Sequence, residues 1–364
     1  MLFRTVLLPS ALSSIPAAPE AAELFFPSAI RLLQDLAENC VLLIDNRRKG
    51  YLLLGFAALH VAIEKWPEKF RIPASKAIQI LEKRRRIVVV NEKYDTCDGC
   101  SLTDCQHAIG VTLSVAGKTP VVVIAGGSCV GCCAKALGGR GVVAVGDYPA
   151  SDFLRERSDG RVLLLSDGEW HRDRFESDVL VPIFRDAEVI KLYDRQIARN
   201  ILSRDEAARP GPITCSLPEN YKTTLMWIAD VFARVSSSSA KKIEIYTTVD
   251  TSYMGNPQIA AVVKAVEAFV EEAAASAGLR PSLFLKTETK HQKMPHGRYL
   301  VTDRIGFLLE RGFDLLWDDK TMQLAKLDPS KDRRPVRDVM ISLCPYTERI
   351  ESTTNKLQTL KIVK

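Results

Sequence analysis

Short apolar runs alternate with helix-like stretches along this chain, and that alternation constrains its fold more than any other feature. Apolar runs typical of buried strands occur at 41–44, 87–90, 121–125, 142–145 and 162–165. Stretches with helical spacing, such as 52–66 and 74–83, lie between these runs. Strands separated by helices usually pair in parallel, and helices then cover both faces of the sheet. The first part of the chain is therefore predicted to be an α/β domain with a mainly parallel sheet.

A second series of strands and helices begins after residue 170. It comprises predicted strands at 188–193, 242–247, 282–286, 298–302 and 306–309, and predicted helices at 223–235 and 257–277. The chain has 364 residues, enough for two domains of ordinary size. We predict a flexible Ala-, Ser- and Pro-rich arm over 1–22, one α/β domain over 23–170 and another over 171–364. Each domain is expected to be a mainly parallel sheet flanked by helices.

Composition and charge narrow the class of protein. Apolar residues make up 46% and charged residues 26%, a balance that excludes a wholly disordered or collagen-like chain. The net charge of +6 permits a polyanionic partner without requiring one. The sequence predicts no membrane span, because no stretch of about twenty apolar residues is free of charge. Pro9 and the single positive charge at Arg4 argue against a signal peptide, and we expect a cytoplasmic location.

The most specific motif consists of His296, Arg298 and Asp303, spaced as HxR, four residues, then Asp. Residues at positions i and i+2 of a strand point to the same face, so His296 and Arg298 can face one phosphate group together. The histidine can act as a nucleophile or proton donor, and the arginine can hold phosphate oxygens through two hydrogen bonds. Asp303 follows the strand and is expected to orient the imidazole. Phosphodiester cleavage needs a nucleophile, a proton donor for the leaving oxygen and a cation near the developing charge.

This segment resembles the phospholipase D superfamily, whose motif is HxK, four residues, then Asp. The surroundings agree, because a strand ending at Asp194, a helix, another strand and a long helix precede the motif. The stretch 312–314 resembles the sequence that follows the motif in that family. The resemblance covers about residues 178–345 and implies a phospholipase D-like domain whose catalytic residues are His296, Arg298 and Asp303.

Two departures from the family pattern leave the activity open. Arg298 stands where the family has lysine, and the chain has one complete motif where the family's active site pairs two. A homodimer can pair two copies of His296, one attacking phosphorus and the other protonating the leaving group. A non-catalytic relative would only bind phosphate. In a purely structural interpretation, His296 and Arg298 pair with Asp303 or Asp314 in a hairpin.

Six of the nine cysteines crowd between residues 97 and 133, which is typical of a metal site in a reducing compartment. They include two CxxC pairs with an internal glycine, Cys97 with Cys100 and Cys129 with Cys132. Such pairs suit tetrahedral Zn²⁺, because glycine accepts the tight turn that directs both thiolates inward. An iron–sulfur cluster is an alternative. So is a metal-free loop in which the cysteines pack as small apolar residues.

Three acids in the first domain, Asp45, Asp104 and Asp147, follow or adjoin predicted strands. Acids at the carboxyl edge of a parallel sheet can bind Mg²⁺ or Mn²⁺ for phosphodiester hydrolysis. At the level of this pattern the domain resembles PIN-like nuclease domains. Asp104 also fits the N-cap of a helix, which is the simpler interpretation of that residue.

These features favour a nucleic-acid phosphodiesterase or nuclease-like protein of the phospholipase D type. Domain pairings of this kind imply an effector in a microbial antiviral defence system. Lys293, Arg311 and Arg195 are expected to contribute to phosphate binding. Nucleic acid is favoured over lipid because the net charge is positive and the sequence has no amphipathic anchor. The alternatives are a non-catalytic module that binds phosphate groups of nucleic acid or lipid head groups in a larger assembly, and a metal-dependent PIN-like nuclease.

Overall fold

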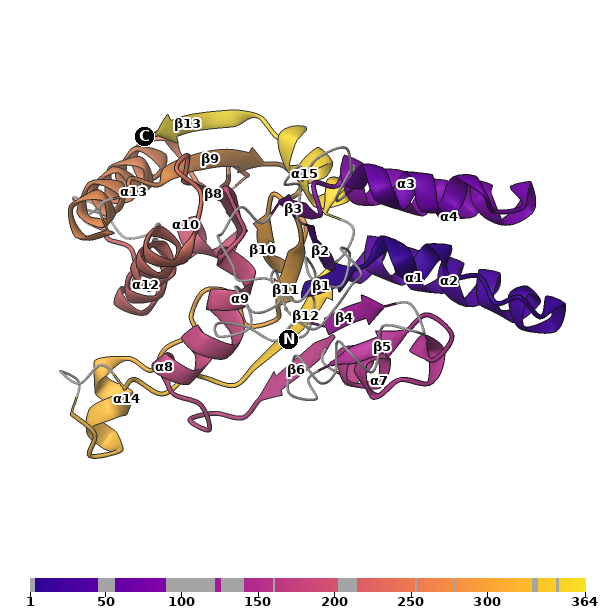
Figure 1. Ribbon diagram of the computed structural model, residues 1–364. Coiled ribbons are helices and arrows are strands. Elements are labelled where there is room, and N and C mark those ends of the chain that lie inside the picture. The colour runs from indigo at the N-terminus through magenta and orange to yellow at the C-terminus, as the bar shows by residue number, and fades with distance from the viewer. Residues whose placement is uncertain are drawn as a thin grey trace. The chain divides into compact units, whose positions relative to one another are not determined.

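The chain divides into two compact units, Met1–Gly160 and Arg161–Lys364 (Figure 1). The computed structural model describes residues 4–44, 56–89, 122–125, 141–159, 161–201, 215–252, 254–277, 279–328, 333–344 and 347–364. Each unit is an α/β structure, so the predicted fold class is confirmed at that level. We describe the two units separately.

The first unit contains a five-stranded sheet with the order β3-β2-β1-β4-β5. Its strands are β1 (Arg4–Leu7), β2 (Val41–Ile44), β3 (Ile87–Val89), β4 (Val122–Ala125) and β5 (Val142–Ala144). All the described strand pairs are parallel, as the alternation of strands and helices predicts. This order reverses direction at β1, which is the arrangement of a doubly wound sheet.

Strand β1 corrects the expectation of a flexible arm over residues 1–22. It lies in the centre of the sheet, paired with β2 on one side and β4 on the other, and Val6 and Leu7 are almost fully buried. The small and polar residues that follow form α1 (Pro9–Ser13) and the start of α2 (Pro19–Asn39). Composition over a 22-residue window concealed the strand, because it has only four residues and two of them, Arg4 and Thr5, are polar.

The remaining helices of the first unit pack through aromatic and aliphatic side chains. They are α3 (Phe56–Glu64), α4 (Glu68–Lys83), the 3₁₀ helix η2 (Tyr148–Ala150) and α7 (Asp152–Asp159). The ring of Trp66, after α3, meets Phe25 and Phe26 of α2 edge to face, with centroids 6.0 and 5.3 Å away. Its indole nitrogen donates to the Leu12 carbonyl at 3.0 Å, so the buried polar group is satisfied.

The second unit contains an eight-stranded sheet with the order β13-β9-β8-β7-β10-β11-β12-β6. Its strands are β6 (Val162–Leu165), β7 (Val189–Tyr193), β8 (Lys242–Asp250), β9 (Ser282–Glu288), β10 (Arg298–Thr302), β11 (Gly306–Leu309), β12 (Val339–Cys344) and β13 (Thr359–Val363). Only β7, β8 and β9 pair in parallel, and the other pairs are antiparallel. The prediction of a mainly parallel second sheet is therefore wrong: the sheet is mixed.

The domain boundary also differs from the predicted one at residue 170. Strand β6, expected in the first domain, pairs with β12 across more than 170 residues of sequence, with Val339 opposite Leu165. The apolar run at 162–165 identified a strand, but a run of four residues carries no information about its partner. This pairing places the start of the second unit at Arg161.

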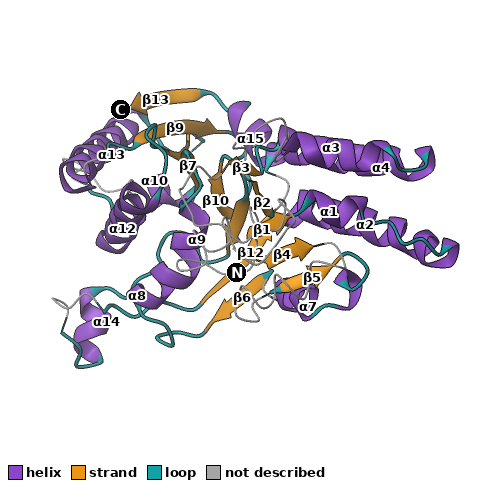
Figure 2. Ribbon diagram, viewed as in Figure 1, coloured by secondary structure: helices purple, strands orange, loops and turns teal. Residues whose placement is uncertain are grey.

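Helices cover the parallel part of the second sheet (Figure 2). The described helices of the second unit are α8 (Arg172–Phe175), the π-helix η3 (Glu176–Leu180), α9 (Val181–Phe184), α10 (Gln196–Ile201), α12 (Glu219–Val235), α13 (Asn256–Ala277), α14 (Asp319–Leu324) and α15 (Glu348–Asn355). On one face, Tyr193, Tyr246 and Phe284 stack across three adjacent strands, with ring centroids 4.7 and 4.6 Å apart. Ile350 of α15 and Met294 complete this cluster.

Candidate functional site

The candidate site lies where the three parallel strands of the second unit end. The carboxyl ends of parallel strands meet at one edge of a sheet, so residues after each strand come together. Asp194 and Arg195 follow β7, Asp250 ends β8, and Glu288 ends β9. Strand β10 runs antiparallel to β7, so its first residue, Arg298, lies at the same edge. The fold therefore brings charged residues from four strands to one place.

His296 reaches this edge from the segment before β10. Its imidazole is exposed, and Nη1 of Arg195 lies 3.0 Å from its Nδ1 and 3.1 Å from its Nε2. A guanidinium donates hydrogen bonds and accepts none, so Arg195 can only be the donor in this contact. Gly297 is needed beside it, because a Cβ there would lie 2.4 Å from the Tyr299 ring. The structure thus presents the His296 imidazole to solvent, in contact with the Arg195 guanidinium.

Glu288 holds the cations beneath His296. Its side chain is fully buried, and Oε2 accepts hydrogen bonds from Arg195 Nη2 at 2.8 Å and Arg199 Nη2 at 2.7 Å. Oε1 accepts from the Met294 amide at 3.0 Å. Arg199 also lies 3.6 Å from Asp250. A buried carboxylate with two guanidinium partners fixes Arg195, and Arg195 in turn fixes His296.

Arg298 lies on the other side of Asp194. Its Nη1 donates to the Glu310 carbonyl at 2.7 Å, and its Nε is 3.9 Å from Asp194 Oδ1. Gly312, at φ +90°, packs against both side chains: a Cβ there would lie 2.8 Å from Asp194 Oδ2 and 3.0 Å from Arg298 Cγ. Glycine is therefore required at position 312 both by the backbone angle and by the close approach.

Asp194 is a buried acid with an unusual protonation equilibrium. Burial raises its pKa to about 6, although the Gln196 amide, the charge of Arg298 and the Phe313 amide oppose that shift. The Gln196 amide donates to Oδ1 at 2.8 Å, while Oδ2 has no hydrogen-bond partner among the described residues. The same is true of the buried Nε atoms of Arg195, Arg199 and Arg298. Buried polar atoms without partners are uncommon in folded proteins, and they mark this edge as a place where a ligand can bind.

Asp303 does not lie with His296, which corrects its expected role in orienting the imidazole. Its Oδ1 accepts hydrogen bonds from the amides of Glu188 and Val189, at 3.0 and 3.3 Å, at the start of β7. Positions 296 and 303 are seven residues apart, which is about 23 Å along an extended chain at the usual rise per residue. Asp303 therefore fixes β10 to β7 at the opposite edge of the sheet.

Two other predicted phosphate-binding cations lie around the same edge as His296. Lys293 is exposed in the segment after β9, and its charge is one of the influences on Asp250. Burial would raise the pKa of Asp250, but two hydrogen bonds from Ser252 and the charges of Arg199 and Lys293 outweigh burial and lower it. Arg311 is partly buried and pairs with Asp338 through Nη1.

Several predicted site residues lie outside the described residues. They are Cys97, Cys100, Cys129, Cys132, Asp45 and Asp104. The zinc site and the acidic site that depend on them stay predictions; metal analysis of the purified chain and of a Cys100→Ser variant tests the first. Asp147 is described and precedes η2, after β5. In the described part of the chain, no group of three or more His, Cys, Asp or Glu side chains is arranged to hold a metal ion.

Sequence reasoning missed Glu288 and Arg199 as members of this site. The rule that acids gather at the carboxyl ends of parallel strands was applied only to the first domain, and it would have selected Glu288 after the strand at 282–286. Arg199 had no comparable sequence signal, because its position depends on how α10 packs against β8.

Comparison with protein-family models found no match for this chain, and a search of curated proteins found none either. No helix in the described residues has the length and apolar character needed to cross a membrane.

Proposed function

We propose that the second unit is phospholipase D-like and binds a phosphate group of a nucleic acid at the edge formed by His296, Arg195 and Arg298. One observation carries this proposal: Arg195, whose buried Nε has no hydrogen-bond partner among the described residues, lies 3.0 Å from the exposed imidazole of His296. Phosphate oxygens are strong acceptors, and they match both guanidinium donors and a histidine. The net charge of +6 favours a polyanion as the source of that phosphate.

A binding assay on the full chain tests this proposal. We expect single- or double-stranded DNA or RNA to bind in fluorescence anisotropy, with affinity that falls as salt rises. Arg298→Ala is expected to weaken binding by about 10-fold or more, because a charge-assisted hydrogen bond is worth about 1.5–3 kcal/mol. Arg155→Ala is the matched control: it removes the same charge from an exposed position in the first unit. Equal affinities of the two variants would contradict the proposal.

A second candidate function is phosphodiester cleavage, and the exposure of the His296 imidazole favours it. In this reaction a ring nitrogen of His296 leaves its contact with Arg195, and its lone pair attacks phosphorus, forming a phosphohistidine as the bond to the leaving oxygen breaks. That oxygen needs a proton, which His296 of a second copy can supply in a dimer, and water then cleaves the phosphohistidine. No metal ion takes part in these steps.

Cleavage is tested with labelled DNA and RNA, with and without EDTA. We expect cleavage that resists EDTA and is lost in His296→Ala, while His291→Ala, which removes an exposed histidine five residues earlier, retains it. Binding without cleavage would leave the non-catalytic module as the function. Cleavage that EDTA abolishes and His296→Ala retains would instead favour the metal-dependent nuclease, with Asp45, Asp104 and Asp147 as its candidate acids.

A further inference from the structure

Arg298 lies directly opposite a buried carboxylate in the sheet. In the pairing of β10 with β7, Tyr299 is opposite Tyr193, so the next position places Arg298 opposite Asp194. The Asp194 side chain is fully buried, while 29% of the Arg298 side chain is exposed. Nε of Arg298 and Oδ1 of Asp194 are 3.9 Å apart, which is an ion pair without a hydrogen bond. The Arg298 side chain therefore contacts a carboxylate in the interior and leaves part of its surface for a ligand.

The segment after β11 passes close to both members of this pair. A Cβ at Gly312 would lie 2.8 Å from Asp194 Oδ2 and 3.0 Å from Arg298 Cγ. The other oxygen of the acid, Oδ1, accepts a hydrogen bond from the Gln196 amide at 2.8 Å. Asp194 is therefore held against Arg298 away from bulk solvent, where two charges interact much more strongly than in water.

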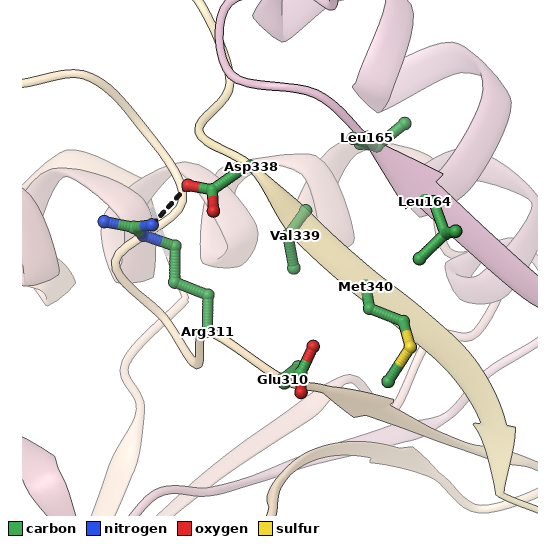
Figure 3. Close-up of a pocket in the computed structure, with 7 residues that line it drawn as sticks. All are labelled: Leu164, Leu165, Glu310, Arg311, Asp338, Val339 and Met340. Carbon is green, nitrogen blue, oxygen red and sulfur yellow. Dashed lines mark hydrogen bonds and ion pairs between the residues drawn. The ribbon is translucent and has the colours of Figure 1, made fainter.

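Two more charged groups of the segment after β11, Arg311 and Asp314, have partners of their own. Figure 3 shows the Arg311 side chain extended toward Asp338, with which it pairs at the rim of a pocket of about 360 Å³. Asp314 Oδ1 lies 3.4 Å from Nε of Arg337. Neither group therefore belongs to the pair formed by β7 and β10.

The other groups that face Asp194 are uncharged. They are the amides of Gln196, at the start of α10, and of Phe313, together with the phenol of Tyr221 on α12. Burial raises the pKa of Tyr221, and the charge of Asp194 raises it further, so the phenol keeps its proton. Burial also raises the pKa of Asp194 to about 6, against the opposing effects of the two amides and Arg298. Asp194 thus changes charge near pH 6, and Arg298 is the one cation among these influences.

We propose that Asp194 sets how tightly Arg298 binds a phosphate group: protonated Asp194 leaves the charge of Arg298 to the ligand, and ionised Asp194 competes with the ligand for that charge. The inference rests on the proposed phosphate site and assigns a regulation to it. A phosphodiester keeps its negative charge throughout the range in which Asp194 titrates. Its binding at Arg298 favours the neutral form of Asp194, so the site takes up protons with the ligand. Affinity should therefore rise as the pH falls through about 6.

Asp194→Asn tests this control on the full chain, with rhodamine-labelled oligothymidylate and oligouridylate as probes in fluorescence anisotropy. At pH 7.5 the variant is expected to bind about 5-fold or more tightly than the wild type, because asparagine carries no charge to compete with the ligand. At pH 5 the two proteins should bind almost equally. Asp178→Asn is the matched control: it removes the same charge from a half-exposed position and should leave the pH profile unchanged.

Histidine side chains titrate in the same pH range, so the contribution of Asp194 is separated from that of His296. The profiles are repeated in a His296→Gln background, where the difference between aspartate and asparagine at position 194 should persist. Calorimetry in buffers of different ionisation enthalpy counts the protons taken up on binding. We expect fewer protons to be taken up at pH 6.5 by Asp194→Asn than by the wild type.

The outcomes separate this inference from the proposed function. An Asp194→Asn variant that binds more weakly than the wild type at pH 7.5, or that follows the same pH profile, would overturn the inference and leave the phosphate site intact. A gain in affinity from Asp194→Asn that persists when Arg298 is replaced by alanine would also overturn it, because the acid would then act without Arg298. Failure of both oligonucleotides to bind any variant would overturn the inference and the proposed function together.

Discussion

Replacing Asp194 with asparagine should stabilise the second unit at neutral pH. The pKa of Asp194 is raised to about 6, mainly by burial, whereas an aspartate in the unfolded chain titrates near 3.9. The folded state therefore binds more protons than the unfolded state between about pH 4 and 6, and stability falls as pH rises through that window. The shift of about two pKa units corresponds to about 3 kcal/mol lost by the wild type above pH 6.

Asparagine keeps the shape of the neutral acid and avoids that loss. Its Oδ1 can still accept the Gln196 amide, which donates to Asp194 Oδ1 at 2.8 Å in the wild type. The advantage of Asp194→Asn should be small at pH 4, about half developed near pH 5 and complete above pH 6.5. The stability gained by Asp194→Asn should not exceed about 3 kcal/mol. The pKa of about 6 already includes the charge of Arg298, which offsets part of the cost of burying the carboxylate.

Hydrogen exchange measured by mass spectrometry on the full chain is a suitable assay. Peptides from β7 and β8 report the unfolding free energy of the second unit even where the two units unfold separately. Asp178→Asn is the control, because Asp178 is half-exposed and its loss should change the unfolding free energy by well under 1 kcal/mol. An Asp194→Asn variant that is less stable than the wild type at pH 7.5, or whose advantage does not vary with pH, would refute the reasoning.

Three further substitutions test the structure around this site. Gly312→Ala should lower stability by about 1–3 kcal/mol, because it forces a Cβ against Asp194 and a strained backbone angle. Gly146→Ala, where no atom lies within 4 Å of the added Cβ, should have little effect in the same thermal unfolding assay. Glu288→Ala leaves two buried arginines without their carboxylate and should cost about 3–5 kcal/mol in urea unfolding, with a smaller loss for glutamine. Asp303→Asn should cost about 1–3 kcal/mol and leave phosphate binding unchanged, and a matching loss of binding would return Asp303 to the site.

Local sequence patterns were enough to locate most of the strands of the second unit. Strands at 298–302 and 306–309 were predicted with the bounds that the structure has, because their apolar runs and the turn between them are local features. Long helices such as α13 were also predicted closely. Apart from the hairpin of β10 and β11, strand partners were not predicted, since a pairing such as that of β6 with β12 depends on residues far apart in sequence. The mixed character of the sheet was missed for that reason.

In the candidate site, too, the local motif could be predicted from the sequence and the distant partners of its residues could not. His296 and Arg298 were selected from a motif of adjacent residues, and the structure places both at the edge where β7, β8 and β9 end. Their partners are distant in sequence: Arg195 is 101 residues from His296, and Glu288 is 93 residues from Arg195. Nothing in a single sequence shows that a buried glutamate holds the arginine that meets the histidine. The motif selected two residues that the structure places at one edge of the sheet, and the fold determines which side chains surround them.

The position of Asp303 gives a reason for the spacing of the motif itself. Four residues between Arg298 and Asp303 form one short strand, so the two ends of the motif lie at opposite edges of the sheet. At one edge Asp303 accepts two backbone amides from the start of β7, and at the other edge His296 meets Arg195 after β7 ends. The aspartate therefore sets how β10 lies on β7, and the histidine depends on that placement to reach its arginine. A chain can retain this spacing for folding alone. The setting of His296 in the fold then depends on residues outside the motif, above all Arg195 and the carboxylate that holds it.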